Sequence, residues 1–409
     1  MLSTALLATE RHHAMQRRAN RNAVIRHLCA RPGSSAPELA IALGLPMSVV
    51  APLLRQFMLE GLLLESRERG AAAGRVLPRY RLDATHLALL GADVGADRVR
   101  VVATSLDGRV LAGTMLEYGR ASSAMRRIDS LATAALRVCE KLGAAAPHVI
   151  GMGLGLPGSA EAPAGESHGD SLPRSRDVPF ASLLARELER SHLEGMPLFL
   201  GSSADVAALG EFDFAPAPDG PSLLYLSLDE DLDAGVIVDG EVLPARRRRT
   251  NGIGHTVLQV DGPRCSCGRS GCAQALIGSR SLLGTAEPDA VGVLGRRLAA
   301  GSPETVSAVA RAGACLGTLL HNLAILYRPS RIVVGGSLTE LGEALLQPAR
   351  LSLGECAASG VALATSRFGG DAVAVGAAAL ARRRLCGRPA PVAPAAPSRC
   401  DATRTAAFF

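Results

Sequence analysis

The 409-residue sequence contains no tryptophan, and aromatic residues make up only 3% of it. Proteins that bind single-stranded nucleic acid stack bases on aromatic side chains, so this class is disfavoured. Apolar runs long enough to cross a bilayer are also missing. The first residues show neither the leading positive segment nor the cleavage site of a signal peptide. We therefore expect a cytoplasmic protein with no membrane partner.

Lysine is almost absent as well, because Lys141 is the single lysine and arginine supplies the other positive charges. The formal net charge is +6 and the isoelectric point is about 9.0, which permits nucleic-acid binding without demonstrating it. A high-GC genome that favours arginine codons is the simpler explanation of the bias. The length and the 48% content of hydrophobic residues suffice for two or three domains with a large core.

Cysteine, in contrast, is concentrated in one place. Residues 254–274 read GHTVLQVDGPRCSCGRSGCAQ, in which one histidine precedes three closely spaced cysteines. Zn²⁺ prefers four tetrahedral ligands drawn from thiolate sulfur and imidazole nitrogen, and the glycines allow a tight fold around so small an ion. Buried thiols beside an unrelated histidine are the alternative, but clustered spacing in an intracellular chain favours metal. The sequence therefore predicts a closed, structural zinc site with the ligands His255, Cys265, Cys267 and Cys272.

This cluster resembles the signature of the ROK family, which groups repressors, open reading frames and sugar kinases. The signature is Glu-x-Gly-His, a spacer, and then Cys-x-Cys-Gly-x-x-Gly-Cys-x-Glu. Its zinc half is complete here, whereas Gly252 and Gln274 stand at the positions of the two glutamates. The resemblance covers roughly residues 86 to 382. It implies an α/β fold, in which residues 86–384 form an actin-like ATPase (ribonuclease-H-like) domain of two lobes, each built as βββαβα.

The segment before this domain, residues 17–83, has the pattern of a winged helix-turn-helix. Three helical segments are followed by two short strands, residues 62–65 and 79–82, which flank an arginine-containing loop. Ser35 and Glu38 form a capping box at the start of the second helix. In ROK repressors such a module precedes the sugar-kinase-like domain. We expect it to bind operator DNA through Ser48, Arg55 and Gln56 of the third helix and through Arg67, Arg69 and Arg75 of the loop.

The third helix is unusually apolar where a recognition helix normally carries polar readers. Met47, Val49, Ala51 and Pro52 offer few groups that hydrogen-bond a base edge. Winged helices also bind proteins, and a fold alone does not determine function. A scaffold that binds protein partners through this module therefore remains an alternative to a DNA-binding protein.

A ROK sugar kinase requires two phosphate loops and a general base, and the resemblance implies that all three are altered here. The loop Asp-x-Gly-Gly-Thr has become Asp93–Asp97, and Gly-Thr-Gly-x-Gly has become Asp229–Asp233. Glycine N–H groups bind phosphate in such loops, whereas carboxylates repel it. Ser203 replaces the catalytic aspartate, and a hydroxyl is no base on its own. We therefore expect no catalytic residue, no bound ATP and no enzymatic activity.

Two alternatives concern the altered loops. The first is an active sugar kinase with unusual loops. The second is a Mg²⁺ or Ca²⁺ site formed by the carboxylates of Asp229–Asp233, although their spacing matches no known calcium loop and a solvated acidic turn is simpler.

The altered signature also changes the sugar-binding pocket that the resemblance implies. It leaves a pocket for a different, sugar-like effector or for no ligand. The candidate effector-binding residues are Gly158, Ser202, Ser203, His255 and Gln274. Together these features predict a non-catalytic ROK regulator of carbohydrate-related genes that acts as a homodimer or homotetramer. Residues 1–16 are expected to form an N-terminal extension and residues 385–409 a disordered tail rich in proline and alanine.

Overall fold

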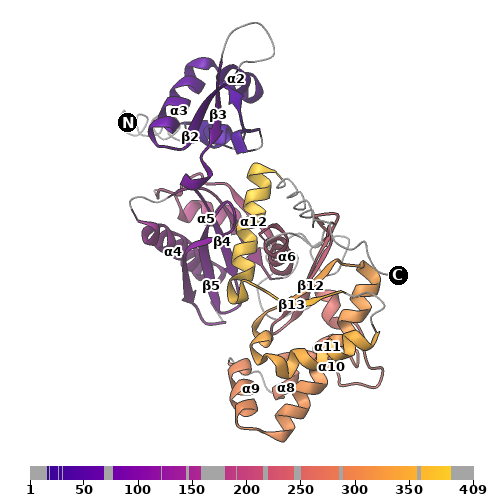
Figure 1. Ribbon diagram of the computed structural model, residues 1–409. Helices are drawn as coiled ribbons and strands as arrows, with labels where there is room; N and C mark the ends of the chain where they lie inside the picture. Colours follow the sequence, from indigo (N-terminus) through magenta and orange to yellow (C-terminus); the bar gives the residue numbers. More distant parts are fainter. Residues whose placement is uncertain are drawn as a thin grey trace, which may run out of the picture.

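The computed structural model describes residues 16–17, 19–25, 27–29, 31–68, 77–120, 122–143, 147–157, 180–189, 191–214, 220–243, 250–284, 289–356 and 361–387. Within these ranges a small N-terminal module sits at one end of a larger α/β body (Figure 1). The predicted N-terminal extension up to residue 15 and the predicted tail beyond Gly387 lie outside the described residues. The last helix of the body continues to Cys386, two residues past the predicted end of the domain.

The N-terminal module consists of helices followed by an antiparallel hairpin. Its described elements are a helical segment within residues 16–29, β1 (Ser34–Ser35), α2 (Ala36–Leu43), α3 (Met47–Leu59), β2 (Leu63–Glu68) and β3 (Leu77–Leu82). The predicted capping box is confirmed, because the Ser35 backbone N–H donates to Glu38 Oε2 at 2.7 Å. Gly44 ends α2 with φ of +62°, a conformation that glycine adopts without strain.

The hairpin is longer than the sequence pattern indicated. Arg67 lies within β2, opposite Pro78 of β3, so its placement in the loop was wrong. The ladder continues from Leu63 to Glu68 because the partner strand already begins at Leu77. Arg69 and Arg75 lie outside the described residues. A short strand that was not expected, β1, pairs with β3 and makes the sheet three-stranded in the order β1-β3-β2.

The body consists of two halves with a similar order of elements, although the second half has three additional helices before its fourth strand. The first half contains β4 (Leu87–Val94), β5 (Arg98–Ser105), β6 (Val110–Glu117), α4 (Ala124–Leu142), β7 (His148–Leu156), α5 (Phe180–Glu187), β8 (Leu198–Ser202) and α6 (Ser203–Asp213). The second contains β9 (Leu223–Leu228), β10 (Leu232–Val238), β11 (Glu241–Val242), α7 (Ala273–Ile277), α8 (Ser279–Leu283), α9 (Ala290–Ala299), α10 (Pro303–Tyr327), β12 (Arg331–Gly335), α11 (Glu343–Cys356), β13 (Leu363–Thr365) and α12 (Ala372–Cys386).

The two five-stranded sheets share one topology. Their orders are β6-β5-β4-β7-β8 and β11-β10-β9-β12-β13, so each runs third, second, first, fourth, fifth strand. The first three strands of each half pair antiparallel, and the last two pair parallel. Because parallel pairing requires a crossover, helices separate the last three strands of each half. The predicted repeated α/β architecture is therefore present, but each half continues beyond the predicted βββαβα with one further strand and helix.

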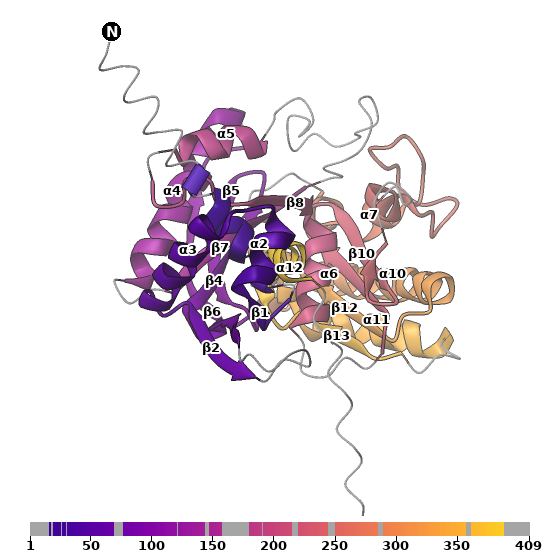
Figure 2. The same ribbon diagram turned by 90° about the horizontal axis from the view of Figure 1, so that it is seen from above.

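The last helix of each half packs on the sheet of the other half. Helix α12 lies against β4 and β7, while α6 lies against β9 and β10, and the two helices cross each other between the sheets (Figures 1 and 2). Glycines make these contacts possible: a Cβ on Gly91 would lie 1.9 Å from the Ala374 carbonyl oxygen, and one on Gly376 would lie 1.8 Å from that of Val206. This exchange of helices joins the halves.

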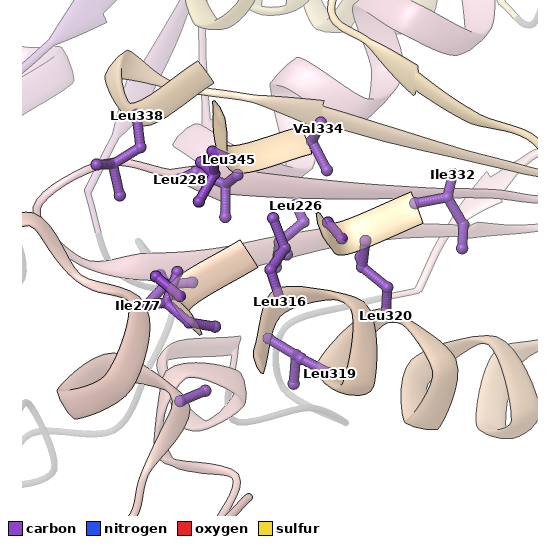
Figure 3. Close-up of a cluster of buried hydrophobic side chains, with 14 of the residues drawn as sticks. Leu226, Leu228, Ile277, Leu316, Leu319, Leu320, Ile332, Val334, Leu338 and Leu345 are labelled. Atoms are coloured by element: carbon purple, nitrogen blue, oxygen red, sulfur yellow. The ribbon is translucent and has the colours of Figure 1, made fainter. Parts of the chain in front are cut away.

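The core of the second half explains why helix α10 is both long and apolar. Among the described helices, α10 alone has the length and composition needed to cross a membrane, yet half of its most apolar window is buried inside the protein. Leu316 and Leu320 of α10 face Leu226 and Ile332 of the sheet, with Ile277 of α7 beside them (Figure 3). The hydrophobic face of α10 therefore belongs to a protein core.

The N-terminal module packs directly on the body. One hydrophobic cluster contains Ile25 and Phe57 of the module together with Leu89 and Leu385 of the body. Polar contacts add to it: Asn22 Nδ2 donates to the Gly195 carbonyl at 2.9 Å. The orientation of the module relative to the first half is thus set by side-chain packing as well as by the connecting chain.

Candidate metal centre and the contact between the two halves

The four predicted metal ligands converge. The ligand atoms of His255, Cys265, Cys267 and Cys272 all lie within 4.8 Å of one another. His255 Nδ1 is 3.4 Å from Cys265 Sγ, and Cys267 Sγ is 3.6 Å from Cys272 Sγ. A tetrahedral zinc with bonds of about 2.0 to 2.3 Å places its ligand atoms roughly 3.5 to 3.8 Å apart. The donor set and the spacing therefore fit a four-coordinate zinc site closed by protein side chains.

Glycine allows the backbone to fold around this cluster. Gly271 has φ of +70°, and a Cβ there would lie 1.4 Å from the Gln259 carbonyl oxygen. Gly262 packs against Gly271, since its Cβ would lie 2.7 Å from the Gly271 Cα. Isolated bridges between Val257 and Cys272 and between Arg264 and Ser270 hold the loop in place. Any larger residue at Gly271 would separate the ligands.

The metal ligands anchor helix α7 in the second half. Cys272 is the N-cap of α7, while His255 ends the short 3₁₀ helix Thr250–His255. Ile277 of α7 is fully buried in the core of this half (Figure 3). A bound metal would therefore join a surface loop to a core helix.

Gln274 of α7 binds the turn between β9 and β10. Its Oε1 accepts the Leu232 backbone N–H at 2.7 Å, and its Nε2 donates to the Glu230 carbonyl at 2.5 Å. Both amide groups thus have protein partners, and the metal cluster is connected to the acidic segment 229–233 through one side chain.

The acidic segment makes protein contacts at both of its first two carboxylates. Asp229 accepts the Ser337 backbone N–H at 2.8 Å and the Ser227 hydroxyl at 2.7 Å. Glu230 forms ion pairs with Arg120, at 2.6 Å, and with Arg280 of α8. Asp233 accepts the N–H of Ala234. Within the part of the chain that the structure describes, the zinc-type cluster is the one group of three or more metal-ligating side chains, so the alternative of a divalent-cation site here gains no support.

The ion pairs of Glu230 tie the two halves together. Arg120 belongs to the first half, between β6 and α4, whereas Glu230 and Arg280 belong to the second. Sequence reasoning missed both arginines, because the pattern around each gives no sign of a partner 110 or 50 residues away. The signal that could have drawn attention to them is the presence of four acidic residues where the family has three glycines and a threonine.

Asp93 and Asp229, which open the two altered phosphate loops, lie close enough to repel each other. Burial, followed by the charge of Asp229, raises the pKa of the Asp93 carboxyl to about 7. Arg100 opposes this shift and is itself paired with Asp371 at 2.6 Å. A polyphosphate placed between these loops would meet further negative charge rather than bare backbone N–H groups.

The remaining effector candidates lie at the start of α6 or outside the described residues. Ser202 is buried and caps α6, accepting the Asp205 N–H at 3.2 Å, and Ser203 is the first residue of that helix. The start of α6 lies against β10, since a Cβ on Gly235 would be 2.2 Å from the Ala204 carbonyl oxygen. The helix start and Gln274 therefore both contact β10, at Gly235 and at Leu232 respectively. Gly158 lies outside the described residues, and His255 belongs to the metal cluster.

Three candidate DNA-binding residues lie on α3, and Arg67 lies in β2. Ser48 and Arg55 are exposed. Gln56 is exposed too, but its Nε2 donates to Glu60 Oε1 at 2.8 Å, so its amide is directed along its own helix. Glu60 in turn binds both terminal nitrogens of Arg21. Ser48 and Arg55 remain the side chains of this set that point to solvent.

Comparison with known proteins places these features in context. The sequence profile of the ROK family matches residues 89–384. The xylose repressor of Caldicellulosiruptor bescii is 22% identical over 361 residues, which covers 83% of this chain and 88% of that protein. The glucokinase of Thermotoga maritima is 28% identical over 289 residues, covering 64% of this chain and 86% of the enzyme.

A solved structure resembles the chain over almost its whole length. It is a ROK family transcriptional regulator described as a homolog of the E. coli MLC protein, with a TM-score of 0.60 and 21% identity. The match covers 91% of this chain and 97% of the other. At this level of identity the likeness shows a shared fold.

Proposed function

This chain belongs to the ROK family, and from that membership we propose that it is a non-catalytic transcriptional regulator that binds operator DNA through its N-terminal module. The observation that carries the proposal is that the two parts of the chain differ in charge and in the residues of their loops. A positively charged module precedes a body whose phosphate loops hold carboxylates engaged in protein contacts.

The module fits a winged helix-turn-helix that binds duplex DNA. Helices α2 and α3 are joined by a short turn after Gly44 and are followed by the hairpin β2–β3, which is the arrangement of such domains. Residues 17–83 contain eleven arginines and five acidic residues, so this segment alone carries the +6 of the whole chain. Since the remainder is neutral overall, the charge distribution favours a polyanionic partner for the module.

The body lacks what phosphoryl transfer requires. Asp229 and Glu230 are bound to Ser337, Arg120 and Arg280, and Asp93 lies near Asp229. Side chains in place of glycines hinder the approach of phosphate to the backbone N–H groups, and the added negative charge repels it, so both changes oppose ATP binding. The hydroxyl of Ser203 is too weak a base to deprotonate a sugar hydroxyl on its own. These features support a body that binds a ligand at most.

Contacts between the halves supply a route by which a ligand could alter the module. The predicted effector residues Ser203 and Gln274 flank β10, and Gln274 binds the turn that carries Glu230. Glu230 joins the halves through Arg120, and the first half packs on the module. A sugar-like ligand that prefers one arrangement of the halves would thereby bias the DNA-binding geometry.

Further parts of the proposal follow from the family. The cluster at His255 holds a structural zinc, and the protein is a cytoplasmic homodimer or homotetramer, as an operator with two half-sites requires. The related xylose repressor and glucokinase both concern carbohydrates, which favours a carbohydrate-related effector and target genes.

Binding to the DNA upstream of its own gene tests the proposal. We expect tight binding. The logarithm of the association constant should fall linearly with the logarithm of the salt concentration, because binding releases counterions from the phosphates. Arg55→Ala should weaken binding, whereas Arg350→Ala, on the exposed surface of α11, should not. Absence of salt-sensitive binding would contradict the proposal. ATP-dependent phosphorylation of common hexoses or amino-hexoses would support the kinase alternative instead.

A further inference from the structure

The solvent-facing side of α3 is chemically unusual for a helix that reads DNA. Val50, Leu54 and Phe57 face the core of the module. Met47, the first residue of α3, is 44% exposed at the start of the helix, and Pro52, on the side opposite these core residues, is exposed. Apolar side chains therefore occupy the start of the helix and part of the exposed face that a winged helix-turn-helix presents to the major groove.

Hydrogen-bonding groups on this face are few. Ser48 is the single hydroxyl of the first two turns, and Arg55 follows one turn after Pro52. The amide of Gln56 is held by Glu60 on the same helix. Readout of guanine or adenine by a bidentate pair needs an arginine, lysine, asparagine or glutamine, and none of these stands in the first two turns.

Just one group in the major groove has an apolar surface, namely the 5-methyl group of thymine. Met47, Ala51 and Pro52 match that surface. Contact between their aliphatic carbons and the methyl group buries apolar surface, which is favourable, and leaves no polar side-chain group without a hydrogen bond. Positive charge elsewhere in the module, where residues 17–83 carry a net +6, supplies the attraction to phosphates that these residues cannot.

We propose that the first two turns of α3 read thymine methyl groups, so that the operator half-site contains thymines in contact with Met47 and Pro52. This inference rests on the proposed DNA-binding function and goes beyond it by naming the bases that are read. Phosphate contacts then supply affinity, and shape complementarity to methyl groups supplies sequence preference.

Removal of single methyl groups tests the inference. Duplexes bound by the full-length protein are selected from a random pool, and each thymine of the selected half-site is then replaced by dU, which differs from dT by that methyl alone. We expect a threefold to fivefold loss of affinity at one or more thymines, the effect of exposing one methyl group.

Variants of the helix show whether these side chains are responsible. In Met47→Ala and Pro52→Ala we expect weaker binding to the selected duplex and a reduced penalty for dU at the thymine that the truncated side chain contacts. Met125→Ala is the matched control, because Met125 is also 44% exposed but lies on α4 of the body. It should retain both the affinity and the dU penalty of the natural protein.

The outcomes separate this inference from the function on which it rests. Enrichment of duplexes whose binding is insensitive to dU at every position would overturn the methyl readout and leave DNA binding intact. A dU penalty unchanged in both helix variants would overturn the role of Met47 and Pro52. Failure to enrich any duplex would overturn the readout and the DNA-binding function together.

Discussion

The buried ion pair between Asp213 and Arg383 offers a sharp test of what holds the two halves together. Asp213 ends α6, and Arg383 lies in the last turn of α12, so the pair joins the two crossed helices. Arg383 Nε and one terminal nitrogen donate to the two carboxylate oxygens at 2.7 and 2.5 Å. The Asp213 side chain has no exposed surface, and that of Arg383 is 10% exposed.

Asp213→Asn removes the negative charge while keeping nearly the same shape. Loss of one partner from a buried pair costs about 3 to 5 kcal/mol, since the remaining charge is buried without compensation. Arg383 keeps its bond to the Gly240 carbonyl and lies 3.8 Å from the exposed Glu241. We therefore expect a loss in the free energy of unfolding near the lower end, about 3 kcal/mol.

Urea-induced unfolding measures this loss, with an exposed pair as the control. Glu343→Gln removes the partner of Arg350 in an ion pair whose side chains are 68% and 43% exposed, and should cost less than about 1 kcal/mol. The double variant Asp213→Leu/Arg383→Met removes both buried charges and should be less destabilised than Asp213→Asn. Equal shifts for Asp213→Asn and Glu343→Gln would refute the reasoning.

Three further predictions concern the candidate site. Glu230→Gln should weaken the contact between the halves by about 1 kcal/mol, because the two ion pairs of Glu230 are partly exposed. Small-angle X-ray scattering should then show a larger radius of gyration, and an unchanged radius would contradict the role of the Arg120 contact. Cys272→Ser should abolish zinc binding in metal analysis and lower the melting temperature, whereas Cys315→Ser, which alters a thiol outside the cluster, should retain one zinc per chain. Burial and the charge of Asp229 raise the pKa of Asp93 to about 7, so the folded state holds that proton more tightly than the unfolded state and loses stability as pH rises through 7. Asp93→Asn should therefore be more stable than the natural protein at pH 8, by roughly 1 to 3 kcal/mol, with little difference below pH 4. A constant difference in the free energy of unfolding across this pH range would argue against the raised pKa.

Local features of the structure followed from the sequence. The capping box of Ser35 and Glu38 involves residues three positions apart, so the pattern alone predicted it. The repeated α/β architecture of the body, in contrast, was predicted from the resemblance to the ROK family. The end of strand β2 was misplaced, since pairing with β3, rather than local preference, determines where the strand stops.

The sequence by itself determined the identity of the metal ligands, since three cysteines and one histidine within eighteen residues need only a local fold to meet. Tertiary structure decided which distant charges meet: Glu230 with Arg120, and Asp213 with Arg383. These partners are brought together by the exchange of α6 and α12 between the sheets, which depends on close packing at glycines. Coulomb attraction is strong only when two charges lie a few ångströms apart in space, and the number of residues between them in the sequence does not indicate that distance. Packing of the fold therefore had to bring each pair together first.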